Sequence, residues 1–101
     1  MSENKAFFPM FIDLTDKRIL VIGAGKIAVR RIRTLLLFTE QVEVTARKFL
    51  PEIQELAAKG KVKVVESTFG EELMDGVFMV LACTDDKRLN SQICATAKKR
   101  N

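Results

Sequence analysis

RILVIGAGKIA, residues 18–28, is the stretch that decides the fold. Its first part, 18–22, is a nearly continuous aliphatic run, which is typical of a strand buried on both faces of a sheet. The motif G-x-G-x-x-A follows, in which Gly23 allows a tight turn, Gly25 lets a phosphate approach the backbone, and Ala28 keeps the helix close to its strand. The stretch therefore predicts a glycine-rich turn whose helix N-terminus binds the pyrophosphate of a dinucleotide. The alternative is a tight strand-to-helix turn that holds no ligand.

Outward from this stretch, apolar runs alternate with helical stretches to both ends of the predicted domain. Apolar residues recur at three- and four-residue steps after the turn, at Ile27, Ala28, Ile32, Leu35 and Leu36. The predicted strands and helices alternate at residues 18–22, 26–38, 41–46, 51–59, 61–66, 71–74, 77–83 and 86–99. This order predicts an α/β fold with a parallel sheet, and right-handed crossovers predict the strand order 3-2-1-4. We therefore expect one Rossmann-like, doubly wound domain over residues 1–101.

The end of the second predicted strand bears on the choice of cofactor. In NAD-binding folds an acidic residue about 20 positions after the glycines binds the ribose hydroxyl. Here the strand ends in two cations, Arg47 and Lys48, while Glu43 lies inside the strand. Two cations suit a 2′-phosphate and favour NADP on chemistry alone, although they could equally be a solvated pair. On these residues the cofactor stays open between NAD and NADP.

The first predicted helix carries a basic side, formed by Lys26, Arg30, Arg31 and Arg33. Such a run is either a solvated face or a surface that attracts a polyanion, which would be nucleic acid or a small molecule with many carboxylates. Nucleic acid is disfavoured, because the net charge is only +4 and the seven aromatic residues, all Phe, are not interleaved with the cations.

Thr84 and Asp85 follow the fourth predicted strand, at the sheet edge where ligands of open α/β folds bind. One reading is that either residue caps the last helix. The other is that both line the cofactor or substrate cleft.

Residues that the sequence lacks exclude several kinds of site. The 101 residues include no His, which excludes Ser–His and Cys–His catalysis and His-ligated metals within this chain. Cys83 and Cys94 form no Cys-x-x-Cys pair, so we expect free buried thiols and no metal site. No apolar run approaches the roughly 18–20 residues of a membrane span. Met1–Lys5 lacks the pattern of a signal peptide, so we expect a cytoplasmic protein that does not bind membranes.

Three motifs together resemble precorrin-2 dehydrogenase, the NAD-binding domain of siroheme synthase. They are FPMFIDL at 8–14, VIGAGKIAVRR at 21–31, and LACTDD at 81–86 with Asn90 after it. In that family an aromatic-Pro-hydrophobic opening precedes the first strand, and a strand ends in Ala-Thr-Asp-Asp, here with Cys83 in place of Ala. The resemblance covers nearly the whole chain.

The resemblance implies oxidation of precorrin-2 to sirohydrochlorin with NAD as hydride acceptor, and in some members iron insertion. The substrate is a tetrapyrrole with many carboxylates, which would give the basic helix a partner. The family uses NAD although this strand tip is often not acidic, so the resemblance favours NAD over NADP. The residues expected to contact the cofactor, from the motif and the resemblance together, are Gly23, Ala24, Gly25, Lys26, Ile27, Arg47, Lys48, Thr84 and Asp85.

One departure from the family concerns the catalytic residue. Members of the family continue after the last helix into a fifth strand, whose Asp is implicated in dehydrogenation, and then into a dimerisation region. We therefore expect a domain truncated before its fifth strand, inactive by itself and homodimeric in its full-length form, and no catalytic residue is assigned. The alternative function is a regulatory Rossmann module that senses a dinucleotide without chemistry.

Overall fold

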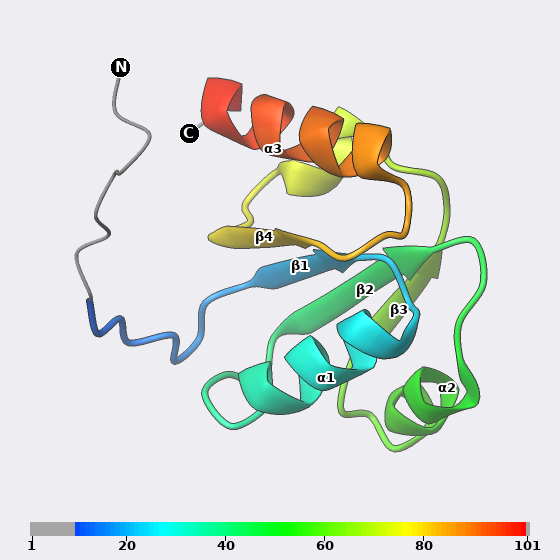
Figure 1. The fold of residues 1–101 in the computed structure, drawn as a ribbon. Coiled ribbons are helices and arrows are strands. Elements are labelled where there is room, and N and C mark those ends of the chain that lie inside the picture. Colours follow the sequence, from blue (N-terminus) through cyan, green and yellow to red (C-terminus); the bar gives the residue numbers. More distant parts are fainter. Residues whose placement is uncertain (1–9, 101) are drawn as a thin grey trace.

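A computed structural model of the chain describes residues 10–100. Four strands alternate with three α-helices and one short 3₁₀-helix, as the sequence predicts (Figure 1). In chain order the elements are β1 (Ile19–Ile22), α1 (Lys26–Leu35), β2 (Val42–Ala46), α2 (Pro51–Ala58), β3 (Lys63–Glu66), η1 (Glu71–Met74), β4 (Met79–Ala82) and α3 (Lys87–Arg100).

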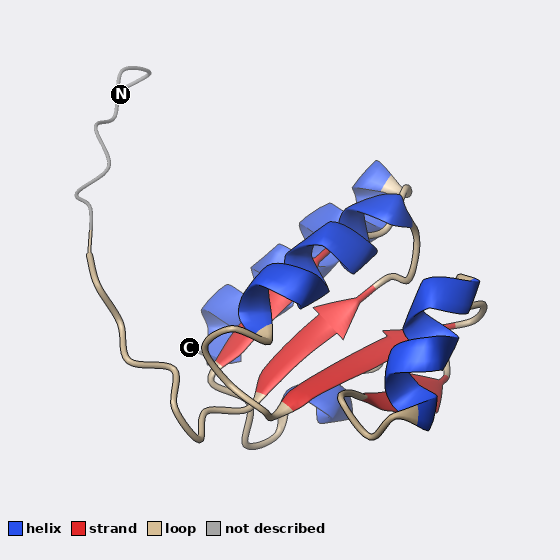
Figure 2. Cartoon of the chain, turned by 90° about the horizontal axis from the view of Figure 1, so that it is seen from below, coloured by secondary structure: helices blue, strands red, loops and turns tan. Residues whose placement is uncertain are grey.

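The strands form one parallel sheet in the order β3-β2-β1-β4, which confirms the predicted α/β fold and strand order. The strands run in the same direction in Figure 2. β1 lies between β2 and β4, with Ile19 opposite Val42 on one side and Met79 on the other. As a result the loops that leave the carboxyl ends of the strands meet at one edge of the sheet.

Helices cover the two faces of the sheet in different halves of the chain. α1 and α2 pack on one face, over a core that includes Val21, Ile32 and Ile53. η1 and α3 lie on the other face, over Leu20 and Ile93 (Figure 1). α1 follows β1 and α3 follows β4, and these two helices lie on opposite faces of the sheet. The change of face therefore falls between β1 and β4. In open α/β sheets this change marks the crevice in which ligands bind.

The central strand is fully covered, whereas β4 is not. The four residues of β1 are between 0% and 3% exposed, as expected for a run that is apolar on both faces. All residues of β4 are only half-buried, because β4 is an edge strand in the part of the chain described. The apolar run 77–83 is therefore longer than the strand it contains, and Phe78 before the strand is 49% exposed.

Three predictions were wrong, one on the end of a helix and two on side-chain burial. α1 ends at Leu35 instead of Phe38, and the following Phe38 is 56% exposed. Ile27 is 58% exposed, because its direction around the helix axis lies beside the buried stripe of α1 and not within it. Cys94 is exposed on α3 and Cys83 is half-buried, so neither thiol is fully buried.

Part of the predicted family opening, Phe8 and Pro9, lies outside the described residues, as does the N-terminal segment Met1–Lys5. Within residues 10–100 no helix combines the length and the apolar character that crossing a membrane requires.

Candidate functional site

Three loops meet at the carboxyl edge of the sheet and are tied to one another through the backbone. They are the glycine-rich turn 23–25, the segment 47–50 after β2, and the segment 83–86 after β4. The connecting bonds are Gly23 N to Thr45 O at 2.8 Å, Cys83 N to Ile22 O at 2.8 Å and Leu50 N to Ala24 O at 3.3 Å. The turn is therefore held at its place by the neighbours on both sides.

Gly23 is required by the protein's own backbone. Its φ of +118° is a conformation that residues with a side chain rarely adopt. A Cβ built on it would lie 2.5 Å from the carbonyl oxygen of Cys83 and 2.9 Å from the amide nitrogen of Thr84. The missing side chain thus allows the end of β1 to pass directly against the end of β4.

Gly25 differs from Gly23 in its backbone conformation and in the space around its Cβ position. Its φ of −94° is ordinary, and a Cβ built on it meets nothing within 4 Å. Gly25 is the N-cap of α1, and no side chain caps the helix; the first helical bond runs from Val29 N to Gly25 O at 3.0 Å. The space beside Gly25 is therefore free of protein atoms, and no side chain caps the first-turn N–H groups at the positive end of the helix dipole. This is an environment that favours a phosphate.

Exposed cations surround this open space. Lys26 lies in the first turn of α1, and Arg47 and Lys48 follow the end of β2, all three exposed. None of them is in an ion pair with another residue of the range 10–100; the five pairs found there involve only Arg18, Lys59, Lys63 and Arg100 as cations. The first turn of α1 carries no acidic residue either. The edge is therefore positively charged and suited to a dinucleotide.

The residues expected after β4 have different local roles. The Thr84 hydroxyl donates to Oδ1 of Asn90 at 2.5 Å and accepts from the Asp86 N–H at 3.2 Å. The Asn90 amide accepts from the Thr84 N–H at 3.2 Å and donates to the Thr84 carbonyl at 2.9 Å. Thr84 is thus engaged in fixing the loop, while Asp85 is exposed beside it.

The cap of α3 is Asp86, so the prediction of Thr84 or Asp85 as the capping residue was wrong. Its Oδ1 accepts from the N–H groups of Arg88 at 2.9 Å and Leu89 at 3.1 Å. The helix begins one residue later than expected, because Thr84 turns toward Asn90 instead. Asn90 belongs to the quoted motif, but its role in closing this loop depends on a contact across one helical turn that the motif alone does not reveal.

Replacing Asn90 with alanine should destabilise the domain by about 2 kcal/mol, because three hydrogen bonds to Thr84 are lost and half-buried polar groups are left without partners. Urea unfolding at equilibrium measures this difference. Gln92→Ala, at an exposed position of the same helix, is the matched control and should change the stability by less than about 0.5 kcal/mol. An Asn90→Ala variant as stable as the control would show that the network does not hold the loop.

Cys83 stands at the end of β4, close to the flank of α1. Burial raises the pKa of the Cys83 thiol above its usual value, and the guanidinium of Arg31 opposes that rise. The sequence by itself places Arg31 only on a basic side of the first predicted helix. Its nearness to Cys83 depends on how α1 crosses the sheet, which no local signal reports.

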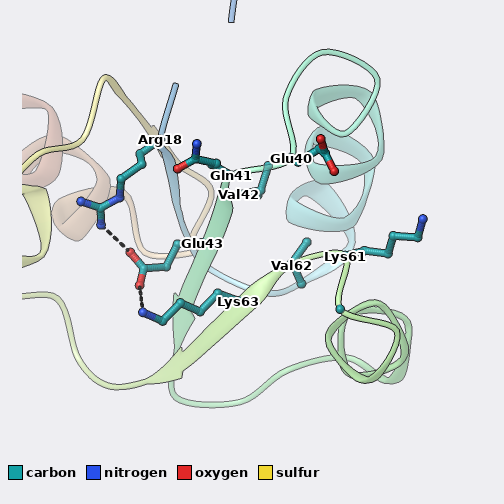
Figure 3. A pocket seen from close by; sticks show the side chains of 9 residues that line it. Arg18, Glu40, Gln41, Val42, Glu43, Lys61, Val62 and Lys63 are labelled. Carbon is teal, nitrogen blue, oxygen red and sulfur yellow. Dashed lines mark hydrogen bonds and ion pairs between the residues drawn. The ribbon is translucent and has the colours of Figure 1, made fainter. Parts of the chain in front are cut away.

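A hollow of about 570 Å³ lies at the opposite edge, at the amino ends of β2 and β3. Figure 3 shows the charges that line it: Glu43 pairs with Arg18 at 3.4 Å and with Lys63 at 3.8 Å. Glu43 is thus engaged away from the cofactor edge, with its side chain only 16% exposed. We place the candidate site at the glycine-rich turn, because the central carboxylate of the hollow, Glu43, is already paired with two cations.

Comparison with known proteins identifies the family. A family model described as "Putative NAD(P)-binding" (NAD_binding_7) matches residues 10–101. The chain belongs to this NAD(P)-binding family. The family match supports a nicotinamide dinucleotide as the cofactor, and it does not distinguish NAD from NADP.

Relatives of this family member include siroheme synthases. The chain is 33% identical over 94 residues to siroheme synthase 1 of Serratia proteamaculans and 38% identical over 94 residues to siroheme synthase 1 of Klebsiella pneumoniae. In both cases the match covers 93% of this chain and 20% of the relative, so the chain spans about one fifth of their length. The structure of SirC, precorrin-2 dehydrogenase, superposes with a TM-score of 0.84 at 32% identity, over 89% of this chain and 46% of that one. The predicted relationship to precorrin-2 dehydrogenase and siroheme synthase is thus confirmed.

Proposed function

We propose that this chain is the cofactor-binding part of an NAD-dependent precorrin-2 dehydrogenase, which oxidises precorrin-2 to sirohydrochlorin in siroheme biosynthesis. The observation that carries the proposal is the open space in front of Gly25, at the uncapped N-terminus of α1. The match to SirC, precorrin-2 dehydrogenase, supports the choice of reaction. In this reaction NAD supplies the hydride acceptor.

The residues of the chain would act mainly by binding and orienting. The N–H groups of Lys26 and Ile27 would donate to the pyrophosphate, and the exposed ammonium of Lys26 would add a positive charge beside it. Gly23 would serve the same site indirectly, by allowing the end of β4 to lie against the turn. Ala24, which is buried, contributes its carbonyl to the bond that ties the turn to Leu50.

Arg47 and Lys48 would lie beside the adenosine ribose, since they follow the end of β2. Their charges would tolerate a 2′-phosphate, but the resemblance to precorrin-2 dehydrogenase favours NAD, and we propose NAD as the cofactor. The segment that holds Thr84 and Asp85 would border the nicotinamide end, because it leaves the strand on the other side of β1.

No residue of this chain is proposed as the catalytic acid or base. Asp86 is occupied in capping α3, and Asp85 has no arrangement that distinguishes it as a proton carrier. Among residues 10–100 no group of three potential metal ligands lies together, so we place any iron insertion outside this domain. The proposal also includes a homodimeric, cytoplasmic parent protein.

The test is turnover by the natural protein that contains this sequence. With precorrin-2 and NAD, sirohydrochlorin and NADH should form together, and NADP should replace NAD only poorly. The same protein carrying Gly25→Val should fold and fail to turn over. A folded protein that binds NAD but forms no sirohydrochlorin would contradict the enzymatic proposal and would favour a module that only senses the dinucleotide.

A further inference from the structure

The cations of α1 lie on two opposite flanks of the helix. Ala28, Val29, Ile32 and Leu35 form the buried stripe. Because successive residues turn by about 100°, Arg31 and Arg33, on either side of Ile32 in sequence, lie on opposite sides of that stripe. Both are exposed, and neither is in an ion pair within the described range. The basic helix is therefore two separate sets of charges.

The flank that carries Arg31 faces β4. The guanidinium lies close enough to Cys83, at the carboxyl end of that strand, to influence its thiol. Cys83 in turn packs against the core beneath α1 and contacts the position of Gly23 through its carbonyl. Arg33 consequently faces the other way, toward β2 and α2. Only the Arg31 flank borders the crevice between the ends of β1 and β4.

The same flank also presents an apolar side chain. Ile27 lies one helical turn before Arg31 on the same side and is 58% exposed. An exposed isoleucine with a free guanidinium one turn away fits a ligand that has an apolar ring and acidic substituents at its rim. The adenosine end of the cofactor would lie toward Arg47 and Lys48, and its nicotinamide end would border the segment after β4. A second ligand that reacts with the nicotinamide would therefore lie on the β4 side.

We propose that Arg31 binds a carboxylate of the tetrapyrrole substrate and is a specificity-determining residue, distinct from the cations that serve the cofactor. This inference rests on the proposed function, because it takes the substrate class from there. It assigns different roles to the two flanks: the flank toward β4 recognises the acidic ring compound, and the flank toward β2 faces the adenosine end of the dinucleotide.

The test uses an octacarboxylate porphyrin, uroporphyrin III, as a stable probe and measures its binding to the chain by the change in porphyrin fluorescence. Arg31→Gln should weaken binding about tenfold or more, as expected for the loss of one charge-assisted contact. Arg33→Gln removes the same charge from the same helix and should weaken binding less than about twofold. NAD affinity of Arg31→Gln, measured by calorimetry, should stay within about twofold of the parent, because Arg31 lies beyond the first turn.

A second measurement tests whether the porphyrin binds close to Cys83. In a Cys94→Ser background, which removes the exposed thiol, bound porphyrin should slow the alkylation of Cys83 by a maleimide. Equal weakening by Arg31→Gln and Arg33→Gln, absence of any porphyrin binding, or binding without protection of Cys83 would each overturn the inference. The proposed function fails in a different experiment: NAD binding or turnover would then be absent, whatever the porphyrin measurements show.

Discussion

Gly23→Ala is expected to lower the free energy of unfolding by about 3 kcal/mol or more. The new methyl group would lie 2.5 Å from the Cys83 carbonyl oxygen and 2.6 Å from its carbon, both backbone atoms that cannot rotate away. The φ of +118° would add strain of about 1–3 kcal/mol, and relief of the overlap would cost a similar amount. Relief would also move the bond between Cys83 N and Ile22 O that fixes the ends of β1 and β4.

A loss of this size is a large part of the total stability of a domain of 101 residues, which is about 5–15 kcal/mol. Urea unfolding followed by circular dichroism measures it. Gly25→Ala makes the same chemical change two residues away, at an ordinary φ and in open space, and should alter stability by less than about 1 kcal/mol. Equal stability of the Gly23→Ala variant and the parent would show that the two strand ends do not meet as described.

Gly25→Val is expected to leave the chain folded and to weaken NAD binding about a hundredfold or more. The branched side chain would fill the space that faces the first-turn N–H groups of α1. A pyrophosphate kept away from them would lose charge-assisted hydrogen bonds worth about 1.5–3 kcal/mol each, and two such bonds account for the expected change. Calorimetric titration of the parent and the variant with NAD gives the ratio of dissociation constants.

The control for this variant is its own thermal unfolding, because the extended backbone at Gly25 accepts a β-branched residue with little strain. Gly25→Ala should fall between the parent and Gly25→Val in affinity. If the folded valine variant bound NAD as tightly as the parent, the pyrophosphate would have to lie elsewhere.

The strand order could be predicted from the sequence because its signals are local and strong. The aliphatic run before Gly23 fits only a strand covered on both faces, and the observed exposure of Leu20 is 0%. Pro51 favours the start of a helix and Gly60 favours its end, and both preferences come from the residues' own backbone properties. Alternation of strands and helices, with right-handed crossovers and the glycine motif after the first strand, then favours the order 3-2-1-4 among the few orders of doubly wound sheets.

Side-chain positions were harder to predict, because they depend on what lies beside an element. Ile27 is apolar at helical spacing, yet it is exposed, because α1 crosses the sheet with a narrower buried stripe than the pattern suggests. Cys94 follows Ile93 and was expected inside, but the next residue on a helix points about 100° away. Asp86 caps α3, because the Thr84 side chain is hydrogen-bonded to Asn90 instead.

The candidate site, too, could be predicted from the sequence only in part. The glycine motif predicts the turn and its helix, because both glycines have roles that follow from the backbone alone. The structure separates those roles: Gly23 is required by contact with Cys83, and Gly25 leaves space for a ligand. Neither that contact nor the nearness of Arg31 to Cys83 could be predicted, since both join segments far apart in the chain.

The most direct test of dinucleotide binding at the glycine-rich turn is a calorimetric titration of the folded chain with NAD, repeated with NADP. We predict saturable binding of one NAD per chain, with NADP weaker, and loss of the signal in the folded Gly25→Val variant. Absence of binding of either dinucleotide at millimolar concentration, to protein shown to be folded by circular dichroism, would contradict the account.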